Sequence, residues 1–102
     1  MMIAPGPLYA KKPPQRSRTH LAFVRSHPCS VCGSWRNVEA AHVGPRGLGQ
    51  IADDFDTIPL CKAHHRIGKY SFHGLGRVAF ETRYKLDIGC LILQLQELGR
   101  TA

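Results

Sequence analysis

The chain contains 102 residues, and its 14 lysine and arginine residues against 7 aspartate and glutamate residues give a formal net charge of +7. This length predicts one small domain and excludes a multidomain enzyme, and the positive charge favours a polyanionic partner. No apolar run approaches the roughly 20 residues that cross a bilayer, and the N-terminus lacks an apolar stretch of signal-peptide length. We therefore expect a soluble, cytoplasmic protein with no membrane partner.

Residues 1–16 predict a flexible basic arm ahead of a single domain over residues 17–102. They include four of the seven prolines, and their charged residues are Lys11, Lys12 and Arg16. The first acidic residue of the chain is Glu39, so everything before it carries only positive charge. Such an arm suits contact with phosphates, although a basic solubilising tail has the same composition.

Four segments before residue 70 have the patterns of short secondary-structure elements. A helix is predicted from Ser17 to Ser26, and Pro28 stops it. The next segments are a strand over 37–43, a loop over 44–49, a second strand over 57–60 and a helix over 61–69. One or two packing helices are expected after Gly74.

The final segment predicts an amphipathic helix that begins after Asp87, which is a good N-cap residue. Its apolar positions recur at helical spacing: Ile88, Leu91, Ile92, Leu95 and Leu98. Core packing explains this stripe most simply, and a dimer seam is the alternative, so the oligomeric state stays open. Cys90 lies in the same helix and is expected to be a buried thiol.

Two pairs of metal-ligand residues have the spacing of zinc knuckles. Cys29 and Cys32 form a CxxC pair, Cys61 and His64 form a CxxH pair, and 28 residues separate the pairs. Tetrahedral zinc takes four such ligands, and in a reducing compartment cysteines at this spacing are more often ligands than disulfide partners. We predict a structural Zn²⁺ site; the alternative is reduced cysteines beside a surface histidine.

Other residues, between the two ligand pairs and just after them, suit phosphodiester hydrolysis. Adjacent residues on a helix point about 100° apart, so His65 faces away from the zinc when His64 faces it. The nearest candidates to meet His65 are His42 and Asp56. We expect these three residues to form a hydrolytic site in which a divalent cation neutralises the phosphate and a neutral histidine activates water.

These landmarks resemble the HNH endonuclease family. The chain reads Cys29-Ser-Val-Cys32, then Ala-Ala-His42-Val-Gly-Pro, then Asp56-Thr-Ile-Pro-Leu-Cys61-Lys-Ala-His64-His65, and the match covers residues 29–65. With Gly-Leu-Gly-Gln at 47–50, Asp-Asp-Phe-Asp at 53–56 and His73, it looks most similar to small prophage-encoded HNH nucleases related to the phage RecA-dependent nuclease. The resemblance implies an α+β fold: a small zinc-stabilised ββα-metal (His-Me finger) domain with flanking helices.

The resemblance also implies roles for individual residues. His42 would be the general base, Asp56 would orient the base or help to arrange the metal, and His65 would bind a catalytic Mg²⁺ or another divalent cation. Many family members carry an acidic metal ligand immediately before the base histidine, where this chain has Ala41. His73 is the best candidate to complete the ligand set.

Several of these residues have simpler interpretations. His42 fits a surface or core histidine, Asp56 fits a turn cap, and His73 fits a turn histidine beside glycines. His20 and His27 have no partner that the sequence identifies.

The remaining charged residues are expected to lie outside the catalytic site. Glu39 is three residues from His42, so strand alternation places it on the opposite face, and Asp53 and Asp54 are expected to be solvated loop charges. Basic residues suited to phosphate contacts are Lys11, Lys12, Arg46, Lys62, Arg66 and Lys69.

The sequence therefore predicts a metal-dependent endonuclease that hydrolyses DNA with low sequence specificity or with specificity for a DNA structure. No set of side chains suggests base-specific readout. The alternative is a non-catalytic zinc-stabilised nucleic-acid-binding module, which Ala41 favours, and a third candidate is a small partner-recruiting protein that uses its C-terminal helix. DNA is the expected partner, and the resemblance adds a recombinase filament and a setting in DNA recombination and repair.

Overall fold

The computed structural model describes residues 15–44 and 53–101, which form a small α+β domain. Its elements in chain order are α2 (Arg18–Arg25), β1 (Val38–His42), β2 (Thr57–Cys61), α3 (Lys62–Arg66), α4 (Phe72–Leu75), α5 (Arg77–Tyr84) and α6 (Ile88–Thr101). The predicted α+β class is confirmed. Most of the predicted arm, and Arg46 in the predicted loop, lie outside the described residues. Within these ranges no helix combines the length and apolar character that a membrane span needs.

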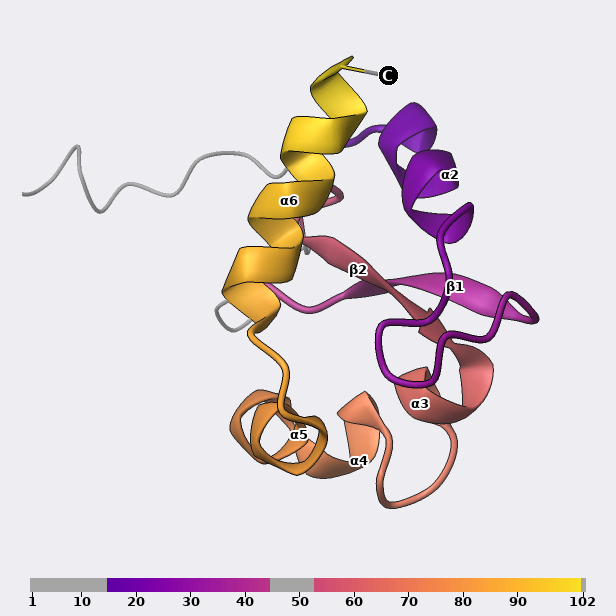
Figure 1. Ribbon diagram of the computed structural model, residues 1–102, viewed down its shortest axis with the longest axis vertical. Coiled ribbons are helices and arrows are strands. Elements are labelled where there is room, and N and C mark those ends of the chain that lie inside the picture. The colour runs from indigo at the N-terminus through magenta and orange to yellow at the C-terminus, as the bar shows by residue number, and fades with distance from the viewer. Residues whose placement is uncertain (1–14, 45–52, 102) are drawn as a thin grey trace, which may run out of the picture.

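The centre of the domain is a two-stranded antiparallel sheet. Its register runs from Val38 opposite Cys61 to His42 opposite Thr57, so both strand predictions are confirmed to within about one residue. Figure 1 shows α2 and α6 above this hairpin and α3, α4 and α5 below it. All five residues of β2 are buried between these layers, whereas β1 is mostly half-buried. One end of β1 therefore remains accessible at the surface.

Helix α2 begins and ends where the sequence predicts. The hydroxyl of Ser17 accepts a hydrogen bond from the backbone N–H of His20 at 3.0 Å, which caps the first turn. The helix ends at Arg25, and Ser26 is its C-cap residue, two positions before Pro28. Val24 packs fully buried against the sheet side of the domain.

Helix α6 confirms the core interpretation for most of its apolar stripe, although Leu98 is exposed. The Asp87 carboxylate accepts a hydrogen bond from the backbone N–H of Cys90 at 3.0 Å, and Ile88, Ile92 and Leu95 are buried in the domain core. The expectation of a buried Cys90 thiol is wrong, because this side chain lies on the exposed face of the helix.

The helix predicted over residues 61–69 is shorter than expected. It ends at Arg66, and Gly68 has a φ of +89°, a left-handed conformation that stops an α-helix. Three helices follow, α4, α5 and α6; the last two begin after Gly74, as predicted, and Phe80 of α5 is fully buried in the core. Ser71 caps α4 by accepting a hydrogen bond from the backbone N–H of Gly74 at 3.0 Å. This turn carries His73 back toward α3.

Candidate functional site

The four predicted zinc ligands meet in one cluster. One donor atom from each of Cys29, Cys32, Cys61 and His64 lies within 4.8 Å of all the others. The Sγ atoms of Cys32 and Cys61 are 3.9 Å apart, and Nδ1 of His64 is 3.2 Å from Sγ of Cys61. These separations match the edges of a tetrahedron around a metal ion with sulfur and nitrogen ligands about 2.3 and 2.0 Å away. The cluster therefore suits a metal ion such as zinc.

The backbone around Cys29 favours its thiolate form, whereas burial raises the pKa of Cys61. Gly33 adopts a φ of +74°, and its N–H donates to the carbonyl of Cys29 at 2.9 Å, which closes the CxxC turn. Burial raises the pKa of the Cys29 thiol. Hydrogen bonds from the backbone N–H groups of Cys32, Cys61 and Val31 together lower it by more, so its pKa lies below the ordinary value. A metal ion needs the deprotonated form of these ligands.

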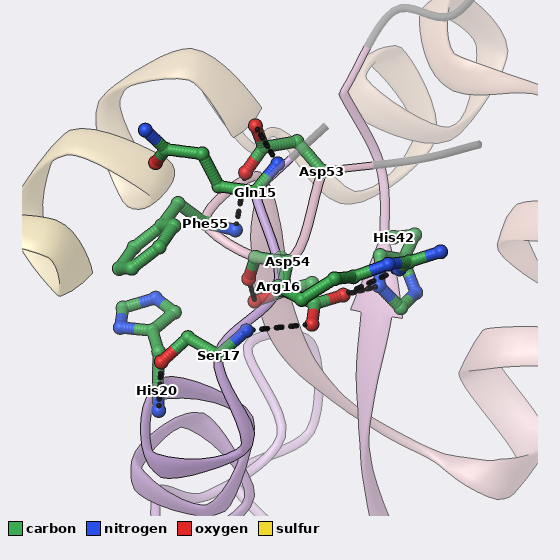
Figure 2. Close-up of polar contacts among 9 residues, drawn as sticks. Gln15, Arg16, Ser17, His20, His42, Asp53, Asp54 and Phe55 are labelled. Atoms are coloured by element: carbon green, nitrogen blue, oxygen red, sulfur yellow. Dashed lines mark hydrogen bonds and ion pairs between the residues drawn. The ribbon is translucent and has the colours of Figure 1, made fainter. Parts of the chain in front are cut away.

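A second group of side chains surrounds Asp54 at the other end of β1 (Figure 2). Nε2 of His42 is 2.9 Å from Oδ1 of Asp54. The same carboxylate accepts hydrogen bonds from Nη1 of Arg16 at 3.1 Å and from the backbone N–H of Ser17 at 2.9 Å. Because an ionised carboxylate only accepts hydrogen bonds, Nε2 of His42 is the donor, and in the neutral imidazole the lone pair is then on Nδ1.

The expectation of a solvated loop charge is wrong for Asp54, which is only 4% exposed. Asp53 is half-buried and accepts a hydrogen bond from the backbone N–H of Gln15 at 3.1 Å at the surface. Burial raises the pKa of Asp54, but hydrogen bonds from His42, Ser17 and Arg16 lower it below its ordinary value. The first described residues of the chain are thus fastened beside His42, although 15 and 16 were assigned to the arm.

Asp56 does not make the carboxylate contact with His42. Its backbone carbonyl accepts a hydrogen bond from Val43 at 3.0 Å, which extends the strand pairing by one residue. Its side chain packs against Gly44, where an added Cβ would lie 2.5 Å from the Asp56 Cβ. Burial and the nearby charge of Asp53 raise the pKa of Asp56. Asp54 is therefore the acidic residue that orients His42, and Asp56 shapes the turn beside it.

Glu39, which sequence reasoning placed outside the site, contacts His65. Oε1 of Glu39 is 2.6 Å from Nδ1 of His65, and both Glu39 oxygens accept hydrogen bonds from the Arg66 guanidinium. Arg66 is the main reason that the pKa of Glu39 falls from 4.5 to about 2; burial opposes the shift and His65 adds to it. The contact leaves Nε2 of His65 as its available ligand atom.

Three of the predicted histidines line one pocket. His42, His65 and His73 line a cavity of about 390 Å³ together with Gly44 and Phe72. The ring centroids of His65 and His73 are 4.7 Å apart. Across the described ranges, however, the cluster of Cys29, Cys32, Cys61 and His64 is the one group of three or more such donors at metal-binding separation. The pocket thus brings the predicted residues together without a preformed cage for a second cation.

We expect the Glu39 ion pair to stabilise the fold in a defined pH range. Because folding lowers the pKa of Glu39, its contribution is complete above about pH 4.5 and is lost as the pH falls toward 2. Glu39→Gln should lower the free energy of unfolding by about 1 kcal/mol at pH 7. Urea unfolding of metal-loaded protein between pH 7 and pH 4 measures this difference, which should be constant down to about pH 5 and then shrink.

Glu97→Gln is the matched control for this variant, because Glu97 pairs with Arg100 on an exposed helix surface. It should change stability by less than about 0.5 kcal/mol. Equal effects of the two substitutions on the free energy of unfolding at every pH would show that the Glu39 contact stabilises the fold no more than an exposed ion pair does.

The predicted phosphate-contacting residues of the described ranges are exposed around α3. Lys62 begins this helix, Arg66 pairs with Glu39 across from it, and Nζ of Lys69 lies 5.1 Å from the ring centroid of Tyr70. Lys11, Lys12 and Arg46 lie outside the described residues.

Comparison with known proteins yields one match. A family model described as a protein of unknown function (DUF968) matches residues 4–97. No curated protein and no solved structure matches the chain. The matched range includes the four metal-cluster residues and the three pocket histidines, and it spans most of the sequence. The chain therefore belongs to the DUF968 family.

Proposed function

We propose that this protein is a metal-dependent endonuclease of the HNH type that hydrolyses DNA phosphodiester bonds. The observation that carries the proposal is the His42–Asp54 pair, which opens on the same pocket as His65 and His73. A histidine oriented by a buried carboxylate, next to further imidazole ligands, is the arrangement that general-base hydrolysis needs. The net charge of +7 supports a polyanionic substrate.

The proposed reaction uses His42 as the general base. Asp54 holds the Nε2–H tautomer, so Nδ1 takes a proton from the water that attacks the phosphorus. His65, whose Nδ1 is held by Glu39, and His73 would hold the cation, with water and phosphate oxygens filling its other positions. That cation would neutralise the phosphate and stabilise the leaving oxygen.

The cluster of Cys29, Cys32, Cys61 and His64 has a separate role in this proposal. We assign it to a structural Zn²⁺, because three sulfur donors and one imidazole form a closed tetrahedral set. It joins the knuckle to the end of β2 and the start of α3, and α3 carries His65. The zinc would thus position the catalytic pocket without entering the reaction.

A plasmid-nicking assay tests the proposal. Zinc-loaded protein should nick supercoiled DNA when Mg²⁺ or Mn²⁺ is added, and His42→Ala should lower the rate by about 10²- to 10⁴-fold while the circular dichroism spectrum stays unchanged. His27→Ala is the matched control. His27 lies next to α2, where its Nδ1 contacts the carbonyl of Phe23, and it is not one of the pocket histidines. Equal nicking by wild type and His42→Ala would reject His42 as the base.

The alternative is a non-catalytic, zinc-stabilised nucleic-acid-binding module, and two observations favour it. Ala41 is fully buried where many HNH nucleases carry an acidic ligand, and the described pocket histidines form no preformed cation cage. This module would bind DNA equally well before and after His42→Ala and would nick no DNA form with any added cation. A recombinase filament as partner stays a prediction.

A further inference from the structure

A second hollow lies at the end of β1 that is remote from His42, beside the metal cluster. Its volume is about 390 Å³, and Ser34, Arg36, Asn37 and Lys62 are among the residues that line it. The carbonyl of Asn37 accepts a hydrogen bond from the backbone N–H of Lys62 at 2.9 Å, so the knuckle and the start of α3 are joined here. This hydrogen bond holds Asn37 and Lys62 together on one wall of the hollow.

The charge of this hollow favours an anion. Arg36 and Lys62 are exposed, and within the described ranges neither makes an ion pair with a carboxylate. With a divalent ion bound, the three thiolates leave the metal centre with about one negative charge, which the two side-chain cations outweigh. No acidic residue lines the described part of this hollow. A phosphate group fits this environment.

Trp35 lies in the chain between Ser34 and Arg36, two of the residues that line the hollow. It is the single tryptophan of the sequence, and 71% of its surface is exposed. A tryptophan normally buries most of its large apolar surface, so this degree of exposure requires an explanation. An exposed aromatic ring beside basic side chains is the pattern of proteins that stack the bases of single-stranded nucleic acids.

We propose that Trp35 stacks on an unpaired base of the DNA substrate while Arg36 and Lys62 hold the adjacent phosphate. This inference rests on the proposed function, and it specifies single-stranded or frayed DNA as the substrate class. Asn37, which lines this hollow, immediately precedes β1, and His42 is the last residue of that strand, so the two residues are at most about 17 Å apart. One single strand of DNA can therefore contact both hollows.

Tryptophan fluorescence tests this proposal directly, because the chain has one tryptophan. Zinc-loaded protein without added magnesium is titrated with three DNAs: a thymidine oligonucleotide that spans both hollows, an abasic strand of the same length, and a blunt hairpin duplex. Stacking predicts strong quenching by the thymidine strand and weak quenching by the other two. Equal quenching by the abasic strand, or none by the thymidine strand, overturns the proposal.

Variants provide an independent readout through the anisotropy of a labelled thymidine strand. Trp35→Ala should weaken binding by about 5- to 100-fold, and Trp35→Phe should retain most of the affinity. Replacing Arg36 and Lys62 together by alanine should reduce the salt slope of log K by about 1.4. Val78→Ala, at another exposed apolar side chain, is the control and should have no effect. Unchanged DNA binding by Trp35→Ala overturns the proposal. The proposal also fails if Trp35→Ala loses self-association and keeps its DNA binding.

The two proposals fail in different ways. Nicking with no Trp35-dependent binding rejects the stacking site and leaves the nuclease intact. Trp35-dependent binding with no nicking by the wild type rejects the nuclease, and the stacking site then belongs to a binding module.

Discussion

Chelation of the zinc ion that we assign to the cysteine and histidine cluster should unfold the protein. The cluster joins the knuckle at Cys29 and Cys32 to Cys61 and His64. Backbone hydrogen bonds from Ser30 to Pro59 and from Lys62 to Asn37 also link these segments. Structural zinc contributes about 10 to 16 kcal/mol of apparent binding free energy in small domains, which equals or exceeds a typical total stability of about 5 to 15 kcal/mol. We expect a chelator to abolish the cooperative thermal transition, and added Zn²⁺ to restore it.

Circular dichroism and native mass spectrometry measure this effect. The intact protein should carry one zinc ion per chain, and Cys61→Ser should lose the ion and the thermal transition together. Cys90→Ser is the matched control, because Cys90 is exposed and is not a member of the cluster. It should keep both the zinc ion and the transition. A chelated protein that still melts cooperatively at the original temperature would contradict a structural role for the ion.

Replacement of Asp54 by asparagine should lower the proposed nicking activity by about 10²- to 10⁴-fold. The Asp54 carboxylate accepts hydrogen bonds from three donors, on His42, Arg16 and Ser17. An asparagine side chain has the same shape but offers only one acceptor oxygen. If its oxygen faces Ser17, its amide group faces His42 and stabilises the wrong tautomer. If it faces His42, its amide group opposes the Ser17 N–H.

Asp56→Asn is the informative comparison, because Asp56 is the residue that the family pattern would select. Its carboxylate packs against Gly44 and makes no hydrogen bond with His42, so we expect a rate loss of less than about tenfold. Single-turnover nicking rates for the two variants, with circular dichroism to confirm their fold, decide between the residues. A larger loss for Asp56→Asn than for Asp54→Asn would show that Asp54 only fastens the N-terminal segment.

The acidic residue that orients His42 was not predictable from spacing. Three aspartates lie within four positions of one another at 53, 54 and 56, and sequence alone treats them as neighbours in a loop. Their separation comes from the turn before β2, in which the hydroxyl of Thr57 donates to the carbonyl of Asp54 at 3.0 Å. This turn directs Asp54 inward, where Ser17 and Arg16 arrive from a segment about 37 residues earlier.

The contacts of Glu39 were also not predictable from local spacing. Strand alternation predicts that Glu39 and His42 lie on opposite faces, but alternation does not say which helix packs beside Glu39. Helix α3 covers it, so Glu39 reaches His65 and Arg66. Glu39, which we expected to lie outside the catalytic site, therefore holds His65, a proposed metal ligand.

The sequence by itself determined the features that depend on short-range spacing. These are the CxxC and CxxH pairs, the two strands, the capped start of α2, and the apolar stripe that buries Ile88, Ile92 and Leu95. Residues three or four apart on a turn or helix share a face whatever the rest of the chain does. Tertiary structure alone decided the partner of His42, the partner of His65 and the exposure of Cys90 and Trp35. These depend on which distant segments pack together, and local spacing does not record that choice.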